Sequence, residues 1–369
     1  MRREHLFRMP HDEAVSLIAR APVAHLASTD DDGAPVLRAV HPVVVDGWAL
    51  FHAAPAGEKT RCLGRPAVLS VEEVVAEVPS YFTDPERACP ATTLYRSAQA
   101  HGPLTEVEDP ALKAAALQAL MEKYQPEGGY APITAEHPLY AKPVAGLLVA
   151  GVALDRVDGK SKLAQNRSPA DLARTVEGLW KRGRRGDPAA IEAVLAANPQ
   201  AVTPAFLRGP GGTRLVCAPT EEDSVAAARL LDGAYWLPDL DRARLSRALL
   251  GSAAWVVARD GDLVVATARA ISDGAQRARV FDVTVAPSHR GVGLGRALVS
   301  LLLDHPAVRD VALVTLGTRD ARGLYEALGF EARETVARAG CAVTEMALVR
   351  GAKGDVGVAK GGSEVGGAQ

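Results

Sequence analysis

One stretch decides the fold of the C-terminal half, and it reads Val283-Thr284-Val285-Ala286-Pro287-Ser288-His289-Arg290-Gly291-Val292-Gly293-Leu294-Gly295-Arg296. It is typical of a β-strand that ends at a proline turn, followed by three glycines at alternate positions that open an amphipathic helix. Glycine lets the backbone approach a ligand closely, and the free amides at a helix N-terminus converge on an anion. The sequence therefore predicts a pyrophosphate-binding loop, to which the two arginines add positive charge.

The segments around this loop predict a mixed α/β sheet covered by helices. Two helices come first, and three strands separated by Asp-Gly turns follow them. After the loop we expect a helix, a strand, a second helix and a last strand, which gives the order ααβββαβαβ. The expected ranges are 220–233, 239–250, 253–258, 263–271, 277–285, 291–305, 310–316, 319–328 and 342–349. A dinucleotide-binding fold fits less well, because there the glycine loop follows the first strand of a βαβ unit.

The stretch resembles the Arg/Gln-x-x-Gly-x-Gly motif of the GCN5-related N-acetyltransferase (GNAT) superfamily. The match continues through Thr318 to Phe330, which is similar to that family's second signature, a helix that carries a tyrosine and closes with Gly-Phe. The resemblance covers residues 213–349 and implies an N-acetyltransferase that uses acetyl-CoA. The residues expected to bind acetyl-CoA are Val283, Val285, Arg290, Gly291, Val292, Gly293, Leu294, Gly295 and Arg296.

The resemblance also implies two catalytic residues. Tyr325 is expected to protonate the departing thiolate, although an aromatic ring at this position could also only pack in the core. Asp282 lies on the strand where the family often places an acid, and it is a candidate for the base that deprotonates the amine. A solvated or turn-capping aspartate is the alternative. Further acids that could line an amine pocket, and that would favour a cationic amine, are Glu221, Glu222, Asp239 and Asp241.

The N-terminal half is dominated by strands, with helices as accessories. Strands are expected over 23–29, 35–45, 48–53, 67–74 and 146–157. Helices are expected near 11–21, from Asp109 onward, and twice within 168–197. A small closed barrel is the economical way to remove the sheet edges. Together with the C-terminal sheet, this predicts an α+β protein of two domains, of which the first is a small barrel with accessory helices.

Polar and basic residues at the strand ends of this barrel suit a phosphate. His52 to Lys59 resembles the His-x-x-x-x-Gly-x-Lys turn of the flavin-binding split barrels of the pyridoxamine-5′-phosphate-oxidase-like superfamily. Lys160 to Asn166 resembles the closing motif of its FMN-binding repressor type. The likeness implies a split β-barrel with FMN as a cofactor and a homodimer through the barrel, although some relatives hold haem or a deazaflavin, or nothing. The expected FMN-binding residues are Arg38, Lys59, Thr60, Gln165 and Asn166.

Composition limits the classes to which this protein can belong. The chain has 369 residues with 48% hydrophobic side chains and a net charge of −2, which fits two globular domains and argues against nucleic-acid binding. The four cysteines are scattered, so neither a metal site nor a disulfide framework is expected. No segment suggests a membrane span, and we expect a cytoplasmic protein. The expected domains are 1–206 and 213–350, joined by a linker at 207–212 and followed by a disordered glycine-rich tail at 351–369.

Three functions remain open from the sequence. The first is an acetyltransferase acting on a small amine, fused to an FMN-binding oxidoreductase-like module. The second is an acetyltransferase whose barrel only senses or dimerises. The third is an FMN-binding transcriptional regulator linked to polyamine metabolism, and it ranks last because no helix-turn-helix segment stands out.

Overall fold

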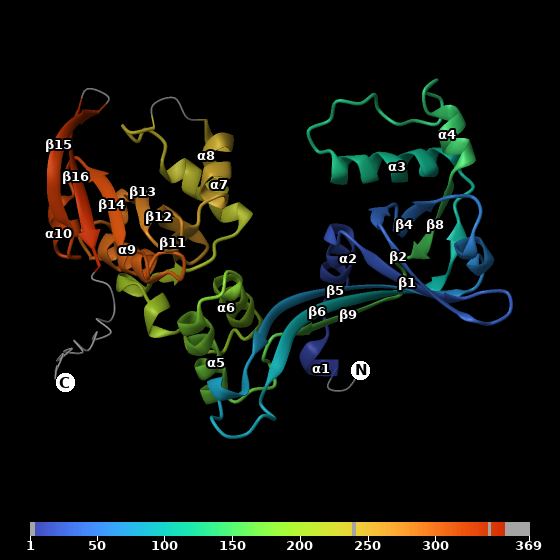
Figure 1. The fold of residues 1–369 in the computed structure, drawn as a ribbon, viewed down its shortest axis with the longest axis horizontal. Coiled ribbons are helices and arrows are strands. Elements are labelled where there is room, and N and C mark those ends of the chain that lie inside the picture. The colour runs from blue at the N-terminus through green and yellow to red at the C-terminus, as the bar shows by residue number, and fades with distance from the viewer. Residues whose placement is uncertain (1–3, 238–240, 339–340, 351–369) are drawn as a thin grey trace, which may run out of the picture. The chain divides into compact units, whose positions relative to one another are not determined.

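The computed structural model describes residues 4–237, 241–338 and 341–350, and the chain divides into two compact units (Figure 1). The first comprises the residues up to 175 together with 196–200, and the second comprises 176–195 and the chain after residue 200. Both units combine sheets with helices, so the predicted α+β class with two domains is confirmed. The predicted domain limits and linker stay predictions, and the predicted tail at 351–369 lies outside the described residues.

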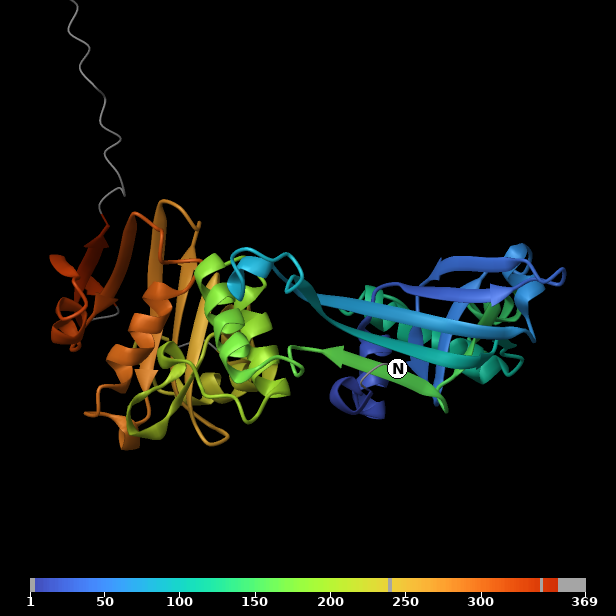
Figure 2. The ribbon, with the colours of Figure 1, turned by 90° about the horizontal axis from the view of Figure 1, so that it is seen from below.

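Two sheets form the N-terminal unit. A five-stranded antiparallel sheet has the order β2-β1-β5-β6-β9, and a four-stranded sheet has the order β3-β4-β8-β7. Figure 2 shows β5, β6 and β9 side by side. No ladder joins the two sheets among the described strands, so the closed barrel expected from the strand pattern is not found there. The strands are β1 Ala24–Thr29, β2 Pro35–Val40, β3 Val43–Val45, β4 Trp48–Ala53, β5 Pro66–Val78, β6 Thr92–Pro103, β7 Thr105–Glu106, β8 Leu148–Ala153 and β9 Val157–Lys162.

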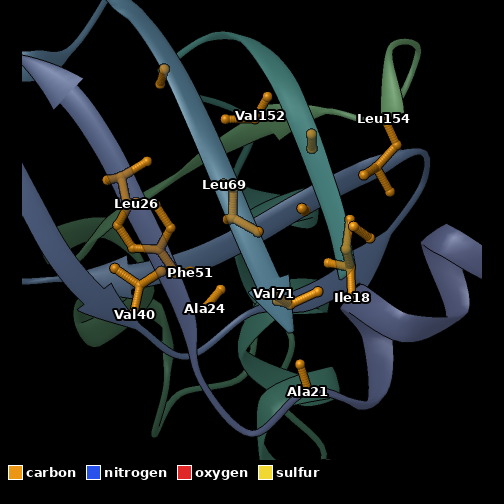
Figure 3. Packing of buried hydrophobic residues seen from close by; sticks show 14 of the residues in the cluster. Ile18, Ala21, Ala24, Leu26, Val40, Phe51, Leu69, Val71, Val152 and Leu154 are labelled. Carbon is orange, nitrogen blue, oxygen red and sulfur yellow. The ribbon is translucent and has the colours of Figure 1, made fainter. Parts of the chain in front are cut away.

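The core of this unit lies between the two sheets (Figure 3). Leu26 and Leu69 come from the five-stranded sheet, Phe51 and Val152 from the four-stranded sheet, and Ile18 from α2; all are buried. A second cluster packs α3 against the four-stranded sheet through Leu120, Leu50 and Val149. Because both faces of β4 and β8 are largely covered, these strands are apolar except for the exposed His52 near the end of β4. The helices are α1 Glu4–Phe7, α2 His11–Arg20, α3 Pro110–Tyr124 and α4 Ala141–Gly146.

Two predicted strands are each divided in the structure. The range 35–45 breaks at His41 and Pro42 into β2 and β3, which belong to different sheets. The range 146–157 likewise gives β8 in one sheet and the start of β9 in the other. Apolar patterning does not show where a chain passes from one sheet to the next, because residues on both sides of the corner face the same core.

The C-terminal unit is built on a seven-stranded sheet of order β10-β11-β12-β13-β14-β16-β15. The predicted order is confirmed, with two more strands, β10 and β15. The elements are β10 Arg214–Val216, α7 Glu221–Leu230, α8 Arg242–Leu250, β11 Ala254–Asp260, β12 Leu263–Ser272, β13 Arg277–Val285, α9 Leu294–Asp304, β14 Leu313–Thr318, α10 Arg322–Glu326, β15 Glu331–Arg338 and β16 Cys341–Val349. Two further helices, α5 Pro169–Arg182 and α6 Asp187–Ala197, precede them.

The sheet opens between its two central strands. All neighbouring strands are antiparallel except β13 and β14, which are parallel. These two pair only where Arg277 to Arg279 lie beside Leu313 to Thr315, although β13 continues to Val285. The rest of β13 therefore leaves β14, and its backbone edge is free to bind a ligand.

Helices pack against the faces of this open sheet. On β11, Trp255 and Val257 pack with α7 and α8, while α9 also contacts β11, β12 and β13. Within the described residues, no helix is both long and apolar enough to cross a membrane.

Candidate functional site

The glycine loop lies between the end of β13 and the start of α9. Gly291 and Gly293 have φ angles of 79° and 86°, a left-handed conformation that favours glycine, and a Cβ atom on either would meet no atom within 4 Å. Gly293 is the N-cap of α9. Within the described part of the chain, the amides of residues 291–296 donate to no protein acceptor. Six free donors at a helix N-terminus form a site that suits a phosphate.

The two arginines of the loop differ in their roles. Arg290 Nε donates to the carbonyl of Val285 at 2.9 Å and so closes the turn after β13. Arg296 is exposed, and no side-chain partner binds it among the described residues. Gly295 packs closely instead, since an added Cβ would lie 3.2 Å from Leu324 Cδ1 and 3.5 Å from Val285 Cγ2. The loop thus combines open backbone on one side with tight packing on the other.

A pocket of about 430 Å³ lies where β13 and β14 separate. Its wall carries the aromatic rings of Tyr235, Trp236 and Phe281. Two arginines of the wall, Arg269 and Arg279, stack on the Phe281 ring at 5.0 and 5.7 Å. The other lining residues are Leu237, Val280, Asp282, Val283, Leu316, Gly317, Thr318, Asp320, Ala321, Tyr325 and Val343. The pocket therefore contains both predicted catalytic residues.

Tyr325 lies on α10 at the wall of this pocket and is 6% exposed. Burial first, and then Tyr235 and Asp320, raise the pKa of Tyr325 to about 12. No protein group bonds to its hydroxyl in the described residues, whereas its ring meets Phe330 edge-on at 5.9 Å. Tyr325 is thus a protonated donor with a free hydroxyl. Its role in catalysis stays a prediction.

Asp282 lies in the same pocket, but both of its oxygens are engaged. Oδ1 accepts a hydrogen bond from Trp236 Nε1 at 2.9 Å, and Oδ2 accepts one from Arg269 Nε at 2.5 Å. The side chain is only 2% exposed. The sequence placed Asp282 at the site, yet it carried no signal for Trp236 or Arg269, because their contacts span 46 and 13 residues.

The other acids singled out from the sequence lie elsewhere. Glu221 and Glu222 lie in the first turn of α7, and Asp241 is the N-cap of α8, where it accepts from the Arg244 amide. None of the three lines the pocket, and Asp239 lies outside the described residues. The charges that do line it are paired, as Arg279 is with Glu345 and Asp320 with Arg319. Among the described residues, the pocket therefore has no cluster of unpaired acids that would bind a polycation.

The predicted FMN residues fall into two groups in the N-terminal unit. Arg38 on β2 pairs with Glu58, the first residue of the short helix Glu58–Cys62. This helix also holds Lys59 and Thr60, and Thr60 Oγ1 donates to the Gly57 carbonyl at 2.6 Å. Gln165 follows β9 and bonds the Ser161 carbonyl and the Leu163 amide, while Asn166 beside it is exposed.

These two groups do not meet in one copy of the chain. Strands β2 and β9 are the opposite edges of the five-stranded sheet. Four strand spacings of about 4.8 Å separate them by roughly 19 Å along the sheet. Lys59 and Gln165 therefore cannot hold one phosphate together. In the described ranges no three His, Cys, Asp or Glu side chains gather as a metal would need.

Two family models match the chain. The model described as pyridoxamine 5′-phosphate oxidase matches residues 10–161, and the acetyltransferase (GNAT) domain matches residues 251–332. The chain joins a pyridoxamine-5′-phosphate-oxidase-like domain to a GNAT domain. Both resemblances found in the sequence are thereby confirmed. The GNAT match contains the glycine loop, Asp282 and Tyr325.

Relatives with assigned names resemble the GNAT domain. A soybean (Glycine max) protein named histone acetyltransferase TAP1 is 40% identical over 70 residues, which is 19% of this chain and 30% of that protein. GCN5-related N-acetyltransferase 1 of Arabidopsis thaliana, a chloroplast protein, is 34% identical over 100 residues, covering 26% of this chain and 51% of its own length. The chain thus spans between about a quarter and a half of the curated relatives it matches.

Solved structures are also similar to parts of this chain. An FAD- and haem-binding protein from Mycobacterium smegmatis has a TM-score of 0.36 and 21% identity, covering 42% of this chain and 73% of its own. An aminoglycoside 6′-acetyltransferase of type Ii has a TM-score of 0.31 and 23% identity, covering 34% of this chain and 88% of its own.

Proposed function

We propose that the C-terminal domain transfers an acetyl group from acetyl-CoA to the amine of a small molecule. One observation carries this proposal: six free amides at the start of α9 lie directly after a strand whose edge is open beside a pocket with a free phenol. The loop suits the pyrophosphate, and the edge of β13 at Val283 and Val285 suits the pantetheine arm. The pocket, with its aromatic wall and paired charges, suits a small amine.

The chemistry is a direct transfer. The amine nitrogen attacks the thioester carbonyl, the C–N bond forms, the C–S bond breaks, and the amine loses one proton while the thiolate gains one. A phenol with a pKa of about 12 keeps its proton at neutral pH. An ordinary thiol has a pKa of about 8.5, so outright proton transfer from Tyr325 is uphill unless burial also raises the pKa of the thiol. Tyr325 therefore acts as a hydrogen-bond donor that stabilises the sulfur as the C–S bond breaks.

The loop assignment is tested with two matched glycines. Gly293→Glu places a carboxylate among the free amides, and we expect acetyl-CoA binding to fall by at least 100-fold. Gly274→Glu is the control, because Gly274 also has a positive φ (76°) and open space around its Cβ position, but it lies in the turn before β13. Calorimetric titration with CoA measures both variants. Equal binding by the two would exclude the loop as the site.

Tyr325→Phe removes the hydroxyl and keeps the ring. We expect kcat to fall between about 10-fold and 100-fold with little change in KM, since the lost bond matters mainly in the transition state. Acetyl-CoA turnover with a panel of primary amines measures the effect, and unchanged kcat would remove Tyr325 from the mechanism.

For the N-terminal domain we propose a flavin, FMN, bound at the interface of a homodimer. The separation of the two residue groups favours this, because a second copy could bring Gln165 and Asn166 of one chain to Arg38, Lys59 and Thr60 of the other. A bound flavin would supply electron-transfer chemistry. The residues of this chain would hold its phosphate through Lys59 and through free donors at the start of the short helix.

The absorption spectrum of the full-length protein tests this proposal, together with its mass in solution by light scattering. A flavin spectrum in a dimer that loses the cofactor on Lys59→Glu supports it. A colourless monomer that cannot be reconstituted with FMN contradicts it, and acetyl transfer is then the one proposed activity that remains.

A further inference from the structure

Asp282 adopts an unusual backbone conformation in the middle of β13. Its φ is 53°, which is left-handed and rare for a residue with a side chain, although aspartate tolerates it better than most. Between the pairs Thr267–Thr284 and Arg269–Phe281, β12 has one residue while β13 has two, Asp282 and Val283. This is a β-bulge, which re-aims the backbone at that point.

Two separate segments hold this bulge through the Asp282 carboxylate. Trp236, on the loop that follows α7, donates its indole N–H to Oδ1, and Arg269 on β12 donates its Nε–H to Oδ2. Arg269 is itself fixed by stacking on Phe281, the residue before Asp282. We call Trp236, Arg269 and Asp282 the bulge latch. Its charges are buried and compensate each other, since Arg269 and Asp282 are 11% and 2% exposed at their side chains.

The latch lies next to the backbone that the proposed function uses. Val283 is the second residue of the bulge, it lines the pocket, and it comes after β13 has left β14. A backbone held in a sparsely populated conformation at a binding site is maintained only by its surroundings. Releasing the carboxylate would let the bulge relax and would move the main-chain groups of Val283.

We propose that Asp282 is a positioning residue: together with Trp236 and Arg269 it holds the Val283 backbone in place for the pantetheine arm of acetyl-CoA. This inference rests on the proposed acetyl-CoA site. It replaces the role of general base, because a base must present a carboxylate oxygen to the amine, and here each oxygen already faces a donor of the protein. Trp236 also lines the pocket, so the wall that contacts the amine and the strand that contacts acetyl-CoA share one hydrogen-bond network.

Binding of CoA without an amine separates the two roles, since a general base takes no part in it. Asp282→Gly permits the left-handed backbone but removes the carboxylate, and Trp236→Phe keeps a ring but removes the indole donor. We expect CoA affinity by calorimetry to fall at least tenfold in the first variant and about threefold to tenfold in the second. The double variant should bind no more weakly than Asp282→Gly alone, because both changes break one network.

The matched control is Asp46→Gly. Asp46 is also an aspartate with positive φ (47°), but it lies in the turn between β3 and β4 of the N-terminal unit. We expect it to leave CoA affinity unchanged. The pH dependence of kcat is the second readout: the residual activity of Trp236→Phe should keep the wild-type profile with a lower plateau.

Two results would overturn the proposal. Undiminished CoA affinity in both Asp282→Gly and Trp236→Phe, with a changed pH profile in the first, would make Asp282 a base. Additive losses in the double variant would mean that the two residues act independently. If the wild-type protein binds no CoA, the proposed function itself fails, which distinguishes that outcome from failure of the latch. If Asp282→Gly does not fold, Trp236→Phe still decides.

Discussion

His305 shows at the scale of one residue how burial sets a charge. It is 7% exposed, its Nδ1 accepts from the Ala307 amide at 3.2 Å, and its ring meets Trp180 edge-on at 6.0 Å. Burial first, and then the charge of Arg309, lower the pKa of His305 from 6.5 to about 4. The imidazole is therefore neutral in the folded protein at every physiological pH.

This lowered pKa predicts a loss of stability in acid. Between pH 6.5 and 4 the unfolded chain binds a proton at His305 that the folded chain does not. The free energy of unfolding is therefore highest above pH 6.5 and decreases as the pH is lowered through this range. The full effect is about 3 kcal/mol. Urea unfolding followed by tryptophan fluorescence at several pH values measures it. His305→Gln should flatten the slope, and an equal slope in both proteins would contradict the assignment.

At the scale of elements, Lys123 ties α3 to the end of α2. Its Nζ donates to the carbonyls of Ala19, Ala21 and Pro42 at 2.9, 2.6 and 2.8 Å. Burial lowers the pKa of Lys123. The carbonyls of Ala19 and Ala21 belong to the last turn and the C-cap of α2. The last carbonyls of a helix have no partner within the helix, and the helix dipole favours a positive charge there.

Removing this contact should loosen the N-terminal unit. We expect Lys123→Met to lower the free energy of unfolding by about 2–3 kcal/mol, because it leaves partly buried carbonyls without donors. Lys142→Met is the control, since Lys142 is exposed on α4. Thermal unfolding followed by circular dichroism measures both proteins. If Lys123→Met lowers the free energy of unfolding no more than the control does, water takes over the hydrogen bonds of the ammonium group and the prediction is wrong.

At the scale of the molecule, α6 and the end of α5 pack with the GNAT sheet. Trp180 donates its indole N–H to Asp304 at 2.6 Å and stacks on Phe206 at 4.7 Å. Glu192 on α6 accepts from the Cys217 amide at 2.8 Å and pairs with Arg214. These residues precede the linker expected at 207–212, so we expect the C-terminal unit to need chain from before this linker for its full stability.

Two fragments test this expectation. We expect residues 168–350 to unfold at a temperature roughly 10 °C higher than residues 207–350, because the shorter fragment loses the buried Trp180 and its partners. Differential scanning calorimetry compares them. Trp180→Ala should lower the unfolding temperature of the longer fragment by part of this difference. Equal unfolding temperatures of the two fragments would instead place the domain boundary at the linker expected from the sequence, 207–212.

Local patterns in the sequence determined most helices, most strands and the glycine loop. Gly291 and Gly293 are recognisable because a positive φ and a bare helix start demand glycine at fixed spacing. Asp282 and Tyr325 could be placed at the site because they lie on a strand and a helix of motifs that are contiguous in the chain.

Only the tertiary structure decided what those residues touch. Trp236 reaches Asp282 across 46 residues, and Lys123 reaches Ala19 across 104, and no local pattern encodes such contacts. It also showed that β13 leaves β14 after Arg279 and that 35–45 passes between two sheets. It further showed that Arg38 lies on one edge strand of the five-stranded sheet, whereas Gln165 follows the strand at the opposite edge. Short-range propensity and spacing act between neighbours in the chain, whereas pairing, burial and charge compensation depend on segments that meet only in the folded state.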